Sequence, residues 1–233
     1  ATLSVATTAD VTVALSTSGT ATEGTDYTDG SGSIDDIVIS AGSTTGTVSF
    51  TPTDDSIYDA TSNETATIAI SGVSGGSATE SGTQSVTITI TDNESAPTVT
   101  LSRSASAIDE DSGSTVTITA TLSVATFQDV TVSIDGTGGT GTEGTDFGTV
   151  SDITISAGDT TGTATVDPTD DSVYEGDETA GISISSVSGG GASESGSQSV
   201  TVTITENESA PTVALTVSSS SINENAGSSL TLT

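Results

Sequence analysis

The chain has 233 residues and carries 32 acidic residues against one basic residue, Arg103, a formal charge of −31. This balance argues against binding to nucleic acid or to an anionic membrane, and it makes cations the natural partners. Because Cys, His and Lys are absent, the chain can form no disulfide, thiolate or imidazole metal site, Schiff base or Lys–Asn isopeptide crosslink. No apolar run approaches the length that spans a membrane, and nothing resembles a signal peptide.

Short runs of alternating apolar residues recur along the chain, separated by clusters of Gly, Asp, Asn and Ser. Alternation with Thr and Ser between β-branched residues is typical of half-buried β-strands. A low aromatic content and a high charge also fit a disordered chain, but the alternation favours a folded one. The runs predict strands, in chain order, at Val86–Ile90, Val116–Ile118, Val130–Ile134, Ile153–Ile155 and Val200–Ile204.

The sequence repeats itself at a spacing of about 114 to 120 residues, which is the size of one β-sandwich domain. "TDNESAPTV" at 91–99 returns as "TENESAPTV" at 205–213, and "ATLSVAT" at 1–7 returns at 120–126. "TEGTDY" at 22–27 likewise matches "TEGTDF" at 142–147. The repeat predicts tandem β-sandwich domains.

The domain boundaries follow from this alignment. Residues 95–208 form a complete domain, residues 1–94 lack its first strand, and residues 209–233 supply that first strand to a neighbouring copy. One explanation is a long repeat polypeptide of which one period is seen. Another is separate subunits that exchange a strand by β-augmentation, and an arbitrarily cut fragment is a third.

The segment "TDDSVYEGDE" at 169–178 places five carboxylates in ten positions without a basic residue. Carboxylates packed together repel one another or take up protons unless a cation neutralises them. Ca²⁺ accepts six to eight oxygen ligands in a flexible shell, so it suits irregular acidic loops better than Mg²⁺. A solvated loop without metal is the simpler alternative, but acidic residues recur at matching places in residues 54–64.

The order of the segments "DEDSGS", "GTEGTDF", "ISAGDTTGTATV", "DDSVYEGDET" and "QSVTVTITENE" resembles the Calx-beta domain, a calcium-binding sandwich. The resemblance implies an all-β fold of tandem immunoglobulin-like antiparallel β-sandwiches of about seven strands each, with Ca²⁺ held at one pole. Family members often end in consecutive Asp residues, where this chain has "DNE" and "ENE". Matching the motifs gives the implied metal ligands of the complete domain: Glu110, Asp146, Asp170, Asp171, Glu175, Glu178, Glu206 and Glu208.

For residues 1–94 the same matching gives a second set of metal ligands. The first-strand Glu is missing there, and Glu224 of a neighbouring copy would supply it, which makes calcium a clamp between subunits. The remaining candidates are Asp26, Asp54, Asp55, Asp59, Glu64, Asp92 and Glu94.

These features favour a structural repeat unit of a calcium-stabilised extracellular filament or cell-surface stalk, with copies of itself as partners. The short linker "ESAPTV" contains proline and limits freedom between domains. A segment of an adhesin that binds a sugar or a surface receptor is the alternative. Enzymatic activity is not expected, because no nucleophile stands beside a plausible base. Three sequons, usable only if the source glycosylates, begin at Asn63, Asn93 and Asn207.

Overall fold

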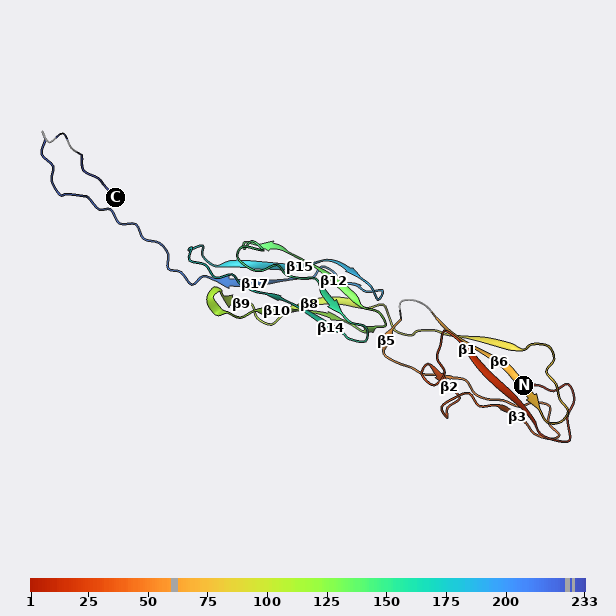
Figure 1. Cartoon of the computed structure of the whole chain (residues 1–233). Helices are drawn as coiled ribbons and strands as arrows, with labels where there is room; N and C mark the ends of the chain where they lie inside the picture. The colour runs from red at the N-terminus through yellow and green to blue at the C-terminus, as the bar shows by residue number, and fades with distance from the viewer. Residues whose placement is uncertain (60–62, 225–226, 228) are drawn as a thin grey trace.

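The computed structural model describes residues 1–59, 63–224, 227 and 229–233. Apart from one 3₁₀ turn, Glu110–Ser112, the regular elements of the described residues are β-strands, which confirms the all-β prediction. Figure 1 shows two sandwiches arranged end to end, with an extended C-terminal segment beyond the second one. Among the described residues, no helix is long and apolar enough to cross a membrane.

The second sandwich consists of two facing sheets. Its strands fall where the alternating runs predict them. One sheet has the order β14-β10-β8-β16, formed by Thr161–Val166, Val116–Leu122, Thr98–Arg103 and Ser193–Glu194. The other has the order β13-β12-β15-β17-β9, formed by Ile153–Ile155, Val130–Gly139, Glu178–Ser188, Ser199–Thr205 and Ala107–Asp109.

Alternation along the strands builds the core of this sandwich. In β10 every second side chain is buried, and the Thr residues between them are only partly covered. Burying the β-branched side chains of both sheets against each other stabilises the domain at about 25 cal/mol per Å² of apolar surface removed from water. The largest side chains in this core are Phe147, Ile118, Ile153, Ile155 and Ile182.

The first sandwich repeats this plan only in part. Its main sheet has the order β3-β1-β6-β7, formed by Ile37–Ile39, Val11–Gly19, Glu64–Ser74 and Ser85–Ile90. A short pair, β2 (Tyr27–Thr28) with β4 (Thr51–Pro52), lies beside it. The buried residues form two small clusters in place of one large core.

The difference between the sandwiches lies in missing partner strands. In the second sandwich, β17 pairs with β9 and β14 pairs with β10. In the first sandwich, the described residues include no partner for the outer edge of β7, and residues 47–50 form no strand. The first sandwich is therefore open along the side where a first strand would pack.

The two sandwiches touch through a short parallel pairing. β5 (Ile57–Tyr58) of the first pairs with β11 (Ala125–Thr126) of the second. The backbone N–H of Phe127 donates to the carbonyl oxygen of Tyr58 at 3.2 Å. The acidic segment 54–59 of the first sandwich thus lies directly at the junction.

Candidate metal centre

Four loops bring acidic residues to one pole of the second sandwich. Glu110 opens the 3₁₀ turn after β9, and Asp146 closes the tight turn that starts at Thr142. The acidic segment 169–178 joins β14 to β15, and "ENE" at 206–208 follows β17. Because alternate loops of an antiparallel sandwich meet at the same end, residues distant in sequence converge there.

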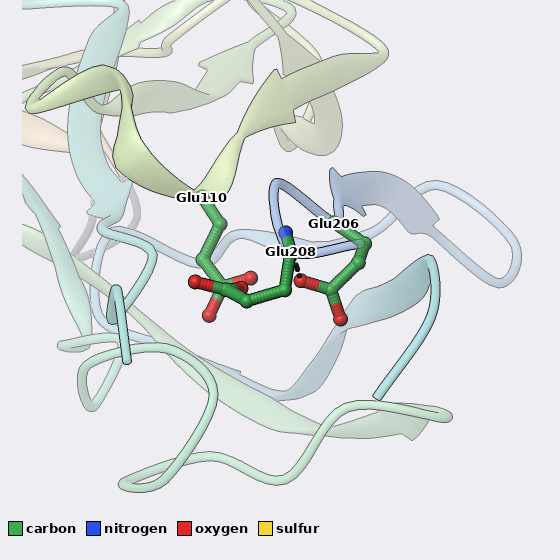
Figure 2. A group of neighbouring side chains, drawn as sticks. All are labelled: Glu110, Glu206 and Glu208. Carbon is green, nitrogen blue, oxygen red and sulfur yellow. Dashed lines mark hydrogen bonds between the residues drawn. The ribbon is translucent and has the colours of Figure 1, made fainter. Parts of the chain in front are cut away.

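The first of two carboxylate groups consists of Glu110, Glu206 and Glu208. One oxygen from each lies within 4.8 Å of the others, and Figure 2 shows the side chains turned toward a common space. Glu110 comes from the turn after β9, and Glu206 and Glu208 come from the segment after β17, so folding is needed to assemble the group.

Glu206 is the residue that organises this group. Its Oε1 accepts the N–H groups of Asn207 and Glu208 at 3.0 Å each, and its Oε2 accepts those of Glu175 at 2.6 Å and Gly176 at 2.8 Å. The hydrogen bonds of Glu208, foremost that from its backbone N–H, and those from Glu175 and Gly176 lower the pKa of Glu206 to about 2. Glu206 therefore stays ionised while it holds the 169–178 loop against the end of β17.

Local backbone geometry makes this possible. Gly176 has a φ of +84°, a left-handed conformation that other residues adopt only under strain. The side chain of Asp177 then accepts the N–H of Glu206 at 3.1 Å, so the loop and the strand end bond to each other in both directions. No sequence motif predicts that Asp177 binds the backbone in this way.

Glu208 shows that the group suits a cation. Its Oε2 is buried and has no hydrogen-bond partner. The hydrogen bond with the Glu206 carboxyl raises the pKa of Glu208 to about 7, and burial and the charge of Glu206 add to the shift. A buried carboxylate oxygen without a donor is costly, and a cation bound by oxygen would satisfy it.

The second group consists of Asp146, Glu175 and Glu178, again with one oxygen each within 4.8 Å. Asp146 is fixed because its Oδ2 accepts the N–H of Thr142 at 2.6 Å. Burial and the charge of Asp146 raise the pKa of Glu178 to about 7, and the same two causes raise the pKa of Glu175. The three carboxylates of this group therefore lie close together without a positive charge to offset their repulsion.

Asp170 and Asp171 lie at the same pole, close enough to Glu110 for their charges to act on it. Asp170 accepts the side-chain N–H of Asn207 at 3.0 Å, and Asp171 accepts the N–H of Val173 at 2.6 Å. Burial and then Glu206 raise the pKa of Glu110 most, and the charges of Asp171 and Asp170 contribute as well. The structure therefore brings together all the acids that the family resemblance assigns to residues 98–208.

In the first sandwich the assigned acids surround one cavity of about 450 Å³ at the junction. Burial and the charges of Asp26, Asp59 and Asp55 raise the pKa of Glu64. A hydrogen bond with Asp92 raises the pKa of Glu94. The cavity is lined by Asp26, Asp54, Asp55, Asp59, Glu64, Asp92 and Glu94, together with apolar side chains that include Phe127 of the second sandwich.

This cavity lacks one of the acidic residues that line the pole of the second sandwich. The part of the chain that the structure describes places no residue there that corresponds to Glu110, and no three of its carboxylates come as close together as those at the other pole. Glu224, assigned to this role, is exposed in the C-terminal segment. Whether any of these residues binds metal stays a prediction.

The segments "DNE" at 92–94 and "ENE" at 206–208 have Asn where family members often have a second Asp, and hydrogen bonds of these Asn side chains explain the difference. The side chain of Asn93 donates to Asp54 at 3.1 Å, as that of Asn207 donates to Asp170. Each Asn thus orients an acidic residue of the neighbouring loop.

The raised pKa values predict how pH affects the metal-free protein. Glu178 and Glu208 titrate near 7 in the folded chain and near 4.5 when unfolded, so the folded state binds more protons between these values. The free energy of unfolding in chelator therefore falls as pH rises from 5 to 8. Thermal melts across this range should show it, and Glu178→Gln/Glu208→Gln should flatten the trend. A melting temperature that rises with pH in wild type would contradict the assignment.

Comparison with known proteins places these sites in context. The sequence model of the Calx-beta domain matches residues 2–94 and 92–208. No curated protein sequence matches the chain.

Several solved structures resemble the chain at low sequence identity. The structure of CBD12 from CALX1.2 is 14% identical, with 87% of this chain and 90% of that chain covered and a TM-score of 0.36. Invasin, a bacterial integrin-binding protein, is 19% identical with a TM-score of 0.40, and the chain covers 97% of its own length but 38% of invasin. Domains 4 and 5 of the S-layer protein SbsC are 20% identical, with 79% and 72% covered and a TM-score of 0.26.

Proposed function

The chain belongs to the Calx-beta domain family, and from this membership we propose that it is a calcium-binding structural repeat unit of an extracellular filament or cell-surface stalk. Calcium is the ion that fits the available donors. With no His or Cys, the ligands are carboxylate and carbonyl oxygens, which hard divalent cations prefer. The irregular loops at the pole suit the flexible coordination of Ca²⁺ better than the octahedron that Mg²⁺ demands.

The observation that carries the proposal is the buried, unpartnered Oε2 of Glu208 within a pole of carboxylates that has no basic residue. Glu110, Glu206 and Glu208 would hold one ion, and Asp146, Glu175 and Glu178 would hold another. Burial raises the pKa of Glu178 most, and the hydrogen bond with Glu206 raises that of Glu208 most; bound calcium would favour the ionised form of both carboxyls and offset the repulsion that adds to these shifts. An ion that binds only the folded state stabilises that state by mass action.

The junction supports a stiffening role. The cavity of the first sandwich is lined both by its own acids and by Phe127 of the second sandwich. Segment 54–59 contributes ligand candidates to that cavity, and it also forms the parallel pairing of β5 with β11. Calcium held there would order the segment that joins the two domains, so ion binding and junction rigidity are coupled.

The distribution of exposed aromatics favours this role over sugar or receptor binding. Among the described residues, Phe127 and Tyr174 are the exposed aromatic side chains, and both belong to loops at the ends of the second sandwich. A binding surface on the flank of a stalk would need such side chains along the sheets. Calcium is plentiful outside cells, which accords with an extracellular location.

Single-molecule energy transfer across the junction tests the stiffening role. Because the chain has no Cys, dyes can be attached at Ser71→Cys in the first sandwich and Ser199→Cys in the second. Calcium is expected to narrow the distribution of distances between them. Asp92→Asn/Glu94→Gln should abolish the narrowing and leave calcium stabilisation of the second sandwich intact. An equally broad distribution with and without calcium in wild type would refute the role.

A further inference from the structure

A tight turn carries Asp146, one of the acidic residues of the second carboxylate group. The carbonyl oxygen of Thr142 accepts the N–H of Thr145 at 3.0 Å and that of Asp146 at 2.9 Å. The N–H of Thr142 donates in turn to Oδ2 of Asp146 at 2.6 Å, and Gly144 donates to the carbonyl oxygen of Phe147 at 2.7 Å. These bonds fix the Asp146 carboxylate within the turn, but they do not fix the turn relative to the sandwich.

The two ends of this turn are anchored to neighbouring segments. Before the turn, the N–H groups of Thr140 and Gly141 donate to the carbonyl oxygen of Thr179 in β15, at 3.1 and 3.0 Å. At its far end, the carbonyl oxygen of Asp146 accepts the N–H of Thr169 at 3.0 Å. Among the described residues, the middle of the turn receives one further hydrogen bond from outside, and that bond is made by Glu143.

Glu143 ties the middle of the turn to the body of the second sandwich. Its Oε1 accepts the N–H of Val150 at 2.6 Å. Val150 is buried in the core, so its backbone is a fixed point for the turn. The Glu143 carboxylate also lies against Gly136 in β12, where a Cβ atom would stand 3.0 Å from Cδ and Oε2 of Glu143. The glycine therefore leaves room for the carboxylate beside the strand.

Glu23 makes the same connection in the first sandwich. The N–H of Thr22 donates to Oδ2 of Asp26 at 2.6 Å, as that of Thr142 does to Asp146. Oε1 of Glu23 accepts the N–H of Ile34, and its Oε2 accepts the hydroxyl of Thr17 in β1 at 2.6 Å. Because β1 is the counterpart of β12, the glutamate links the turn to the same strand in both sandwiches.

The bond is kept although the loops around it differ in length. Glu23 and Ile34 are 11 positions apart, whereas Glu143 and Val150 are 7 positions apart. What the two turns share is the aspartate that they carry. Asp26 lines the cavity of the first sandwich, and Asp146 has one oxygen within 4.8 Å of those of its two partner carboxylates. The glutamate thus accompanies the aspartate and not a particular loop.

We propose that Glu143 is a positioning residue for calcium. By binding Val150 it holds the turn at the place where the Asp146 carboxylate meets those of Glu175 and Glu178, and Glu23 has the same role for Asp26. The inference rests on the proposed calcium-binding function and adds a residue that belongs to neither carboxylate group. Groups that orient metal ligands through hydrogen bonds typically change the metal affinity by about ten- to a hundredfold when they are removed.

Two variants separate the hydrogen bond of Glu143 from its charge. Glu143→Ala removes both the acceptor and the charge. Glu143→Gln removes the charge but keeps an oxygen that accepts the N–H of Val150. Asp129→Ala is the matched control for stability, because Oδ1 of Asp129 accepts the N–H of Ala157 at 2.8 Å at the opposite end of β12 from the turn.

Amide hydrogen exchange of the full chain in chelator tests the positioning without any metal. The N–H of Thr142, which donates to Asp146, should exchange several-fold faster in Glu143→Ala than in wild type, as measured by NMR. Its exchange should stay at the wild-type rate in Glu143→Gln and in Asp129→Ala. The N–H of Ile118 in the central strand β10 reports opening of the whole domain and serves as the internal reference.

Luminescence of Tb³⁺, used as a substitute for Ca²⁺, measures the affinity of the group that contains Asp146. Tyr174 directly precedes Glu175, so the part of the signal that Tyr174→Phe removes comes from an ion at this group. The Tb³⁺ concentration at half saturation should rise roughly tenfold in Glu143→Ala. It should stay close to the wild-type value in Glu143→Gln and in Asp129→Ala.

Each other outcome has a distinct meaning. Equal weakening in Glu143→Gln and Glu143→Ala would show that the charge acts and not the hydrogen bond, which overturns the inference. Wild-type affinity in Glu143→Ala, or unchanged exchange at Thr142, would also overturn it, because Glu143 would then be structural in the way that Asp129 is. A wild-type chain that binds neither Tb³⁺ nor Ca²⁺ would refute the calcium function itself and the inference with it.

Discussion

Removing calcium is expected to lower the unfolding temperature of the second sandwich by roughly 10 °C or more, because an ion present at a hundred times its dissociation constant contributes about 2.7 kcal/mol. The physical reason is the crowding of carboxylates at the pole. Burial and then the charge of Asp146 raise the pKa of Glu178 to about 7, and the hydrogen bond with Glu206 and then burial raise the pKa of Glu208 to about 7. Differential scanning calorimetry in excess calcium and in chelator measures the shift. Mg²⁺ should restore less of it than Ca²⁺.

The matched variant is Glu175→Gln/Glu178→Gln, which removes two carboxylates of one group and keeps their shapes. It should reduce the calcium-dependent shift and raise the melting temperature in chelator, because it removes repulsion around Asp146. The two effects have opposite signs, so general damage to the fold cannot imitate them. If wild type melts at the same temperature in calcium and in chelator, segment 169–178 is a solvated acidic loop.

Glu206→Gln is expected to destabilise the metal-free protein, because it disrupts the hydrogen bonds by which the Glu206 carboxylate holds the 169–178 loop. Both carboxylate oxygens of Glu206 accept backbone N–H groups, so an amide would turn its NH₂ group toward donors. Glu110→Gln is the control, since Glu110 is a member of the same group that lacks this set of backbone bonds. Urea unfolding in chelator compares the two variants.

Glu110→Gln should leave stability in chelator unchanged or slightly higher and weaken only the response to calcium. Glu206→Gln should lower both. Equal behaviour of the two variants in chelator would show that Glu206 does not organise the loop. It would also remove the distinction between a residue that holds the site together and one that only binds the ion.

Much of the fold could be predicted from the sequence because alternation is a local signal. The alternation at Val116 and Ile118 predicts a strand without reference to the rest of the chain, and both side chains are buried in β10. The same signal at Val86–Ile90 located β7, but it could not reveal that the outer edge of β7 pairs with no strand among the described residues. Whether a strand edge is paired depends on a segment distant in sequence. Only the alignment of the two repeats indicated that residues 1–94 have no counterpart of the first strand.

The acidic residues of the site could be predicted as a set, but the different role of each residue could not. Family motifs located Glu206 and Glu208 together, yet one is held ionised by backbone N–H groups and the other has a buried oxygen without a partner. The bond of Asn207 to Asp170 likewise depends on two loops meeting in space. The pairing of β5 with β11 escaped prediction because Ile57 and Tyr58 stand alone among acidic residues.

A crystal structure of the chain grown in calcium, with an anomalous difference map, tests the central claim most directly. We predict an ion among Glu110, Glu206 and Glu208 and another among Asp146, Glu175 and Glu178, each with oxygen ligands at about 2.3–2.6 Å. If the map is empty at both groups while calcium saturates the crystal, the pole is not a calcium site and the calcium-stabilised stalk is refuted.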